Sequence, residues 1–96
     1  MGRLVLTRKT GESIRIDTPM GAYNLTFQDF RGNRAHFVFD GPIQIEFVTI
    51  RLGEKFDFCG GSIQWEQHRS SRDIVRVLFD LPREINIVRR ELVKYL

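Results

Sequence analysis

The chain has 96 residues, of which 42% are hydrophobic, and a formal net charge of +3. This length suits one domain with its own core and leaves no room for a second. No apolar stretch could span a bilayer and the first residues do not resemble a secretion signal, so we expect a cytoplasmic protein without a membrane segment. The single cysteine, Cys59, cannot form an internal disulfide, which agrees with a reducing compartment.

Nearly every segment alternates between apolar and polar residues with a period of two, which predicts strands. Turn-forming pairs such as Gly11-Glu12 and Gly53-Glu54 separate these segments. Only residues 88–96 have the apolar spacing of a helix, and a helix this short needs packing against a sheet to be stable. The expected strands span, in chain order, residues 3–9, 13–16, 22–28, 34–39, 43–51, 55–58, 62–67, 73–79 and 84–88.

The chain also contains an internal repeat in two blocks. The segment AHFVFDGPIQI at 35–45 aligns without a gap with VRVLFDLPREI at 75–85, and LTRKTGESIRI at 6–16 aligns with VTIRLGEKFDF at 48–58. Two matches in the same order indicate a duplication. We therefore expect a single domain over 1–96, built from half-repeats at 1–47 and 48–96. Each half is too small to bury a core alone, so the two should fold as one intertwined unit.

Positive charge gathers at the two ends of the chain. Residues 1–10 carry three cations and no acid, and residues 83–96 carry four cations against two acids, so the middle of the chain has a negative balance. If folding brings the ends together, they form a basic patch suited to phosphate. The alternative interpretation is solvated charge that keeps the ends soluble.

The segments LVLTRKTGESIRI, GNRAHFVFDGP and LPREINIVRREL together resemble the carbon storage regulator family (CsrA/RsmA) of bacterial RNA-binding proteins. The resemblance covers most of both half-repeats, although the hairpins at 17–29 and 59–71 match only in pattern. Members of that family are shorter and form interleaved homodimers. The resemblance therefore implies two fused protomers in one mostly β chain. Intertwined antiparallel sheets would form a pseudo-dimeric β-barrel or sandwich with a short C-terminal helix, monomeric in solution.

The resemblance also implies a function, namely post-transcriptional repression. Such proteins bind single-stranded or hairpin-loop RNA with a GGA element in mRNA leaders, and they repress translation by covering the ribosome-binding site. Each RNA site combines the first strand of one protomer with the fifth strand of the other, and a protein antagonist is a further partner. The family commonly has histidine at the position of Val88. Carried over to this chain, the site residues are Leu6, Thr7, Arg8, Lys9, Leu81, Pro82, Ile85, Ile87, Val88 and Arg89.

The chemistry of these residues agrees with RNA binding. Proteins read unpaired bases through hydrogen bonds to base edges and through stacking. The Arg89 guanidinium can hydrogen-bond a guanine edge or stack on a base, while Leu6 and Ile87 can support base planes. Arg8 and Lys9 would add phosphate attraction that is sensitive to salt and independent of sequence.

The first half-repeat lacks an equivalent site. Arg89 stands seven positions after Pro82, whereas Thr49 stands seven positions after Pro42. The stretch 43–51 would have to serve both as the fifth strand of the first half and as the first strand of the second. We therefore expect one working RNA site.

Catalysis is not expected from this sequence. His36, His68 and Cys59 are scattered without metal-ligand spacing, so we expect no metal, no cofactor and no cysteine nucleophile. Asp40 and Asp80 occupy equivalent repeat positions before prolines, where turn capping is their expected role. The rival function is a degenerate module that has lost RNA binding and pairs with a protein partner through a sheet edge or the helix.

Overall fold

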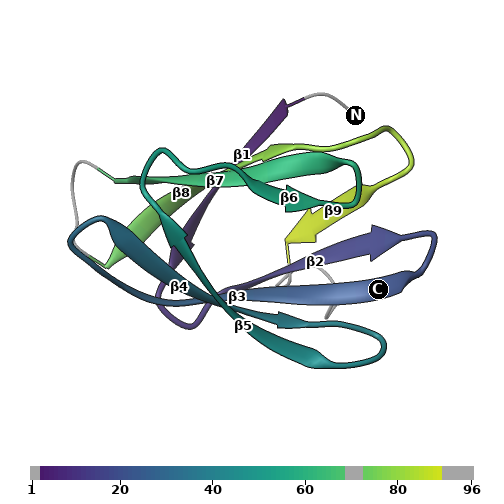
Figure 1. The fold of residues 1–96 in the computed structure, drawn as a ribbon, viewed down its shortest axis with the longest axis horizontal. Coiled ribbons are helices and arrows are strands. Elements are labelled where there is room, and N and C mark those ends of the chain that lie inside the picture. Colours follow the sequence, from purple (N-terminus) through teal and green to yellow (C-terminus); the bar gives the residue numbers. More distant parts are fainter. Residues whose placement is uncertain (1–2, 69–72, 90–96) are drawn as a thin grey trace.

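A computed structural model describes residues 3–68 and 73–89 of the chain (Figure 1). Within these residues the strands form two antiparallel sheets, one of four strands in the order β1-β8-β7-β6 and one of five in the order β5-β4-β3-β2-β9. The strands are β1 (Arg3–Lys9), β2 (Ser13–Thr18), β3 (Gly21–Arg31), β4 (Arg34–Asp40), β5 (Ile45–Arg51), β6 (Phe56–Phe58), β7 (Gly61–Gln67), β8 (Ile74–Asp80) and β9 (Asn86–Arg89).

The mostly β prediction is confirmed, and a strand lies in each stretch where alternation predicts one. The largest differences are at strand ends. β3 runs on to Arg31, past an irregularity in its pairing between Phe27 and Asp29. β5 begins only at Ile45, because the amide of Gly41 donates to the carbonyl of Gln44 and holds a turn there.

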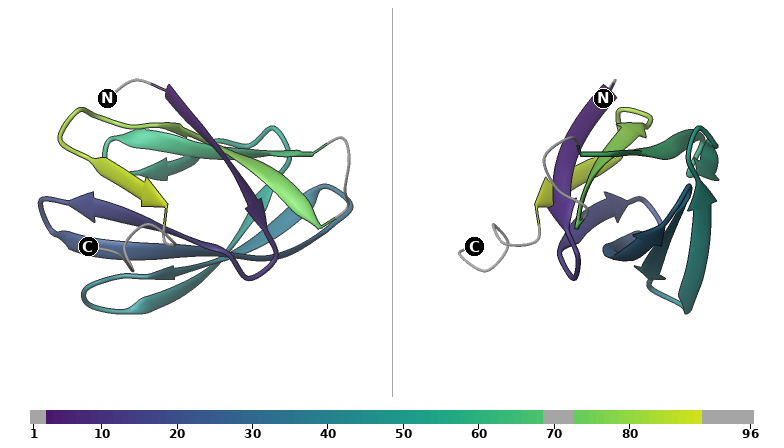
Figure 2. Two further views of the ribbon diagram at one scale, coloured as in Figure 1. Left: turned by 180° about the vertical axis from the view of Figure 1, so that it is seen from behind. Right: turned by 90° about the vertical axis from the view of Figure 1, so that its left-hand side faces the viewer.

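Of the two expected architectures, barrel or sandwich, the barrel is not found: the sheets remain two separate layers that face each other (Figure 2). The expected helix also needs correction. The helix predicted for 88–96 does not begin at Val88, since Val88 and Arg89 belong to β9. The rest of that predicted helix, residues 90–96, lies outside the described residues.

The first strand of each half pairs with the fourth strand of the other half: β1 with β8, and β5 with β4. Lys9 lies opposite Ile74, and Arg51 lies opposite Arg34. Lys9 aligns with Arg51 in one block of the repeat, and positions 34 and 74 immediately precede the other block, so both pairings keep one register. The expected boundary between residues 47 and 48 therefore falls inside β5.

The turns that follow these two strands are built alike. The Lys9 amide donates to Glu12 Oε1 at 2.7 Å, and the Arg51 amide donates to Glu54 Oε1 at 2.9 Å. The glycine between them in sequence has φ +87° at Gly11 and +86° at Gly53, a conformation that glycine adopts without strain. The two Gly-Glu pairs of the repeat therefore have the same structural role: each reverses the chain, one after β1 and the other after β5.

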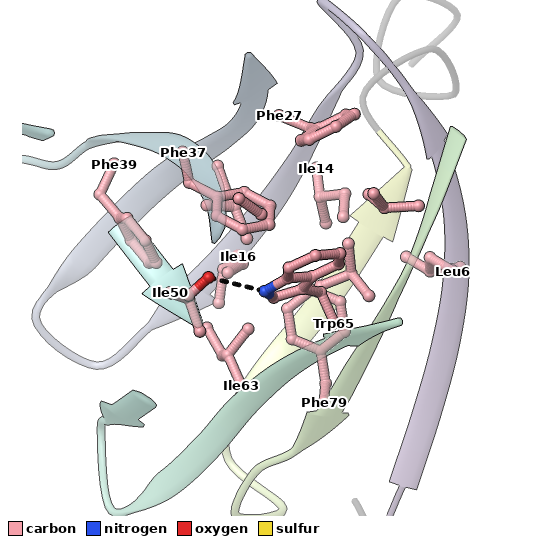
Figure 3. Close-up of a cluster of buried hydrophobic side chains, with 14 of the residues drawn as sticks. Leu6, Ile14, Ile16, Phe27, Phe37, Phe39, Ile50, Ile63, Trp65 and Phe79 are labelled. Atoms are coloured by element: carbon pink, nitrogen blue, oxygen red, sulfur yellow. Dashed lines mark hydrogen bonds between the residues drawn. The ribbon is translucent and has the colours of Figure 1, made fainter. Parts of the chain in front are cut away.

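The hydrophobic core lies between the two sheets (Figure 3). Trp65 of β7 crosses this layer and its Nε1 donates to the carbonyl of Ile50 in β5 at 2.7 Å. Burial of each large side chain contributes roughly 1.5–3 kcal/mol, so the core accounts for most of the cohesion between the sheets. The most deeply buried large side chains are Trp65, Phe27, Phe37, Phe79, Ile14, Ile16, Leu25, Ile50, Ile63, Val75 and Val77.

The sheets differ in one strand. β2 pairs on one side with β3 and on the other with β9, whereas its repeat equivalent β6 pairs with β7 and has no second strand neighbour in the described part of the chain. After β8 the chain continues into β9, but after β4 it turns directly into β5. Residues 46–49, which the repeat aligns with β9, lie in β5 and pair with β4.

Candidate nucleic-acid interface

The edge strands β1 and β9 lie on one side of the molecule, and β5 and β6 lie on the opposite side (Figure 2, right). β9 is antiparallel to β2, with Arg89 opposite Ile14. Ile14 closely follows the turn that ends β1, so the C-terminal ends of β1 and β9 converge on this turn. The expectation that β1 would lie directly beside β9 is wrong as a strand pairing, because the two belong to different sheets and β2 connects them.

The predicted residues of β1 divide between the core and the surface. Leu6 and Arg8 are buried, with exposed fractions of 6% and 3%, whereas Thr7 and Lys9 are exposed. Leu6 points into the core (Figure 3). Arg8 takes the position that the buried Ile50 occupies in the other half. The prediction of Arg8 as a surface phosphate contact therefore needs correction, and Lys9 is the exposed cation at this end of β1.

The predicted residues of the second half divide in the same way. Leu81 and Ile85 are buried and belong to the core, while Pro82, Ile87 and Val88 are half-buried. The amide of Ile85 donates to the carbonyl of Pro82 at 3.1 Å, which turns the chain into β9. Arg89 is placed by its backbone at the end of β9, and its side chain lies outside the description.

One cation next to this surface was not among the site residues predicted from the sequence. Arg15 of β2 lies opposite Val88 of β9, its side chain is 40% exposed, and its Nε donates to Asp17 Oδ1 at 2.7 Å. The alternation of β2 already places Arg15 on the face away from Ile14 and Ile16. Only the pairing of β2 with β9 brings it next to the predicted site, and no local sequence signal specifies that pairing.

Among the residues that the structure describes, no group of three or more potential metal ligands is found. His36 Nδ1 is within hydrogen-bond distance of Thr49 Oγ1, at 3.0 Å, and so belongs to the β4–β5 pair. Desolvation by partial burial raises the pKa of the Cys59 thiol.

The described part of the chain holds no helix with the length and apolar character required to cross a membrane. No protein-family model, curated protein or solved structure gives a significant match to this chain.

Proposed function

We propose that the protein binds single-stranded, GGA-containing RNA at the surface where β1 and β9 converge, and that it represses translation by covering the ribosome-binding site of mRNA leaders. The proposal rests on the sequence resemblance and on one observation: Lys9 and Arg89, nearly at opposite ends of the chain, reach the same turn. The charge distribution predicts such a basic patch, because the cations gather at both ends of the chain.

The backbone at this surface suits unpaired bases. β1 has a single strand neighbour, β8, and β9 has a single strand neighbour, β2, among the described strands. The backbone N–H and C=O groups along their open edges can hydrogen-bond the edges of unpaired bases, which is how much sequence-specific RNA recognition works. Thr7 and Lys9 supply a hydroxyl and a cation on the exposed face of β1, and Arg89 supplies the guanidinium that reads guanine.

The fold proposal is a pseudo-dimer of two half-repeats of the carbon storage regulator type in one chain. The exchange of β1 and β5 between the halves supports it, because neither half has a complete sheet without the strand of the other. Since both partners of the interleaved fold are in one polypeptide, the protein is monomeric in dilute solution. Sedimentation velocity at micromolar concentration tests this, and a tight dimer contradicts it.

The proposal includes one RNA site per chain, and the same topology supports this. On the opposite side β5 is used as the first strand of the second half, and no described strand lies along β6. Thr49, the counterpart of Arg89 by spacing from proline, sits instead in β5 opposite His36. The second surface therefore lacks both the fifth strand and its arginine.

The test is fluorescence anisotropy with a GGA hairpin and its GGA-to-CCA variant. The wild-type chain should prefer the GGA hairpin, and Arg89→Ala should cost about 1–3 kcal/mol and erase most of this preference, as for loss of a bidentate base contact. Thr49→Ala is the matched control and should change the affinity little. Equal losses from both substitutions contradict a single site. Equal, weak binding of both hairpins by the wild-type chain favours the rival function, a protein-interaction module without RNA specificity.

A further inference from the structure

The β6 edge on the second side borders a hollow of about 490 Å³. Tyr23, Phe39, Phe56 and Phe58 form its aromatic wall, with ring centroids of neighbouring pairs 5.1 to 5.5 Å apart. The turn at 41–44 forms another wall, where Ile43 is 90% exposed. Phe56, Asp57 and Phe58 of β6 line this hollow, and in the repeat they correspond to residues 14–16 of β2, which pair with β9.

The other half shows what fills the equivalent space. There β9 and the turn before it cover β2, and Leu81, Ile85 and Ile87 pack into the core. In the first half, Ile45 and Phe47 correspond to Ile85 and Ile87. They lie in β5 and are 57% and 77% exposed. The hollow is therefore a largely aromatic site that no strand of the described residues covers.

The backbone of β6 is oriented to receive such a strand. Cys59 and Gly60, with φ of +48° and +82°, form a two-residue hairpin loop of the type I′ kind, so the flanking residues Phe58 and Gly61 exchange hydrogen bonds. By the alternation of an antiparallel ladder, the N–H and C=O of Asp57 then point away from β7 to the open edge. Asp57 corresponds in the repeat to Arg15, which pairs with Val88.

We propose that the β6 edge and this hollow bind an extended peptide segment of a protein partner, which adds antiparallel to β6 as β9 adds to β2. Backbone hydrogen bonds at Asp57 supply affinity, and two alternate apolar side chains enter the aromatic hollow, which is the usual division of roles in β-augmentation. Glu46 and Asp57 also line the hollow, so the segment carries basic residues beside its apolar ones.

The chain's own segment 81–89, which ends in β9, serves as the model for the bound peptide. The segment 81–89 combines Ile85 and Ile87 with Arg83 and Arg89 around a single acid, Glu84, and this is the apolar and basic pattern that the hollow requires. A synthetic peptide of this sequence, blocked at both ends, is therefore the probe. It is added to the full-length protein, and binding is measured by isothermal titration calorimetry.

Three peptide variants test the mode of binding without changing the protein. N-methylation at the Val88 position removes the hydrogen bond to Asp57 and should weaken binding about tenfold or more. N-methylation at the Ile87 position, whose amide faces away from β6, is the matched control and should have little effect. Aspartate in place of both isoleucines should abolish saturable binding.

Two protein variants test the charge. Asp57→Lys should weaken the unmodified peptide up to about fivefold, the range for an exposed ion pair. Glu66→Lys, an equal charge reversal on the exposed face of β7, should leave the affinity unchanged. Thermal unfolding confirms that both variants fold.

Amide chemical shifts show where the peptide sits. The proposal predicts changes in β6 and in residues 41–46. Changes confined to β2 and β9 would mean that the peptide competes with the chain's own strand, and would overturn the proposal. Failure of the peptide to bind at millimolar concentration, or sedimentation showing that a second copy of the chain covers β6, would also overturn it. None of these results depends on RNA binding.

Discussion

The two sides of this molecule differ by one strand among the described residues. On one side β1 and β9 converge on a turn, with Ile85 buried just before β9 and Ile87 and Val88 of β9 half-buried. On the other side β5 and β6 occupy the equivalent edges and no described strand corresponds to β9. The repeat alignment allows two roles for the segment 45–51, and the structure shows one of them, the pairing with β4. As a result, β6 has one strand neighbour among the described residues, and Ile45 and Phe47 are exposed.

The largest contrast between the sides should be in the stability effects of Ile85 and its repeat equivalent Ile45. Ile85 is 2% exposed, so Ile85→Ala should lower the free energy of unfolding by about 2–5 kcal/mol. Ile45 is 57% exposed, and Ile45→Ala should stay within about 0.5 kcal/mol of wild type. Urea unfolding of the two variants measures this, and similar losses would show that the surface around Ile45 is covered in solution.

A smaller effect is expected where the two halves use different aromatic residues. Trp65 and Phe27 occupy equivalent positions, since Trp65 faces Val77 as Phe27 faces Phe37. Trp65→Phe should therefore fit sterically but leave the buried carbonyl of Ile50 without its indole donor, at a cost of about 1–3 kcal/mol. Chemical denaturation tests this. An unchanged free energy of unfolding would mean that water replaces the indole and that the hydrogen bond does not hold the sheets together.

The exposed cations at the ends of β1 and β5 should contribute differently to RNA binding. Lys9→Ala should weaken the GGA hairpin and the CCA hairpin alike and reduce the salt dependence of binding by roughly one phosphate contact. Arg51→Ala, the same change at the equivalent exposed position of β5, should leave the slope unchanged. Anisotropy titrations over a salt series give both slopes, and equal reductions would place phosphate on both sides.

The smallest effect is expected in the hairpin at the open edge. Cys59 has φ +48°, which an L-residue with a side chain adopts at a cost, and asparagine tolerates this conformation better. Cys59→Asn should raise the free energy of unfolding by about 0.5 kcal/mol. Thermal unfolding under reducing conditions measures the change, and a loss of stability would contradict the type I′ assignment on which the orientation of Asp57 depends.

The sequence predicts the strands well, because half-buried antiparallel strands alternate visibly and Gly-Glu turns mark their ends. The repeat also predicts that the halves cannot fold apart. Burial at single positions is harder to predict. Arg8 aligns with the buried Ile50, but its own burial becomes clear only once the register of β1 with β8 is known. Arg15 was missed for the same reason, since its neighbour Val88 is far away in sequence. The double role of residues 43–51 indicates from the sequence that one strand cannot be duplicated, but the hollow beside β6 becomes apparent only once β5 is known to pair with β4.

The most direct test of the one-sided RNA site is the stoichiometry of the complex, measured by native mass spectrometry with the GGA hairpin in excess. With a single RNA site, we expect one RNA bound to one protein chain, and no such complex with the CCA hairpin at the same concentration. Two RNAs on one chain, or a complex that forms equally with both hairpins, would contradict it.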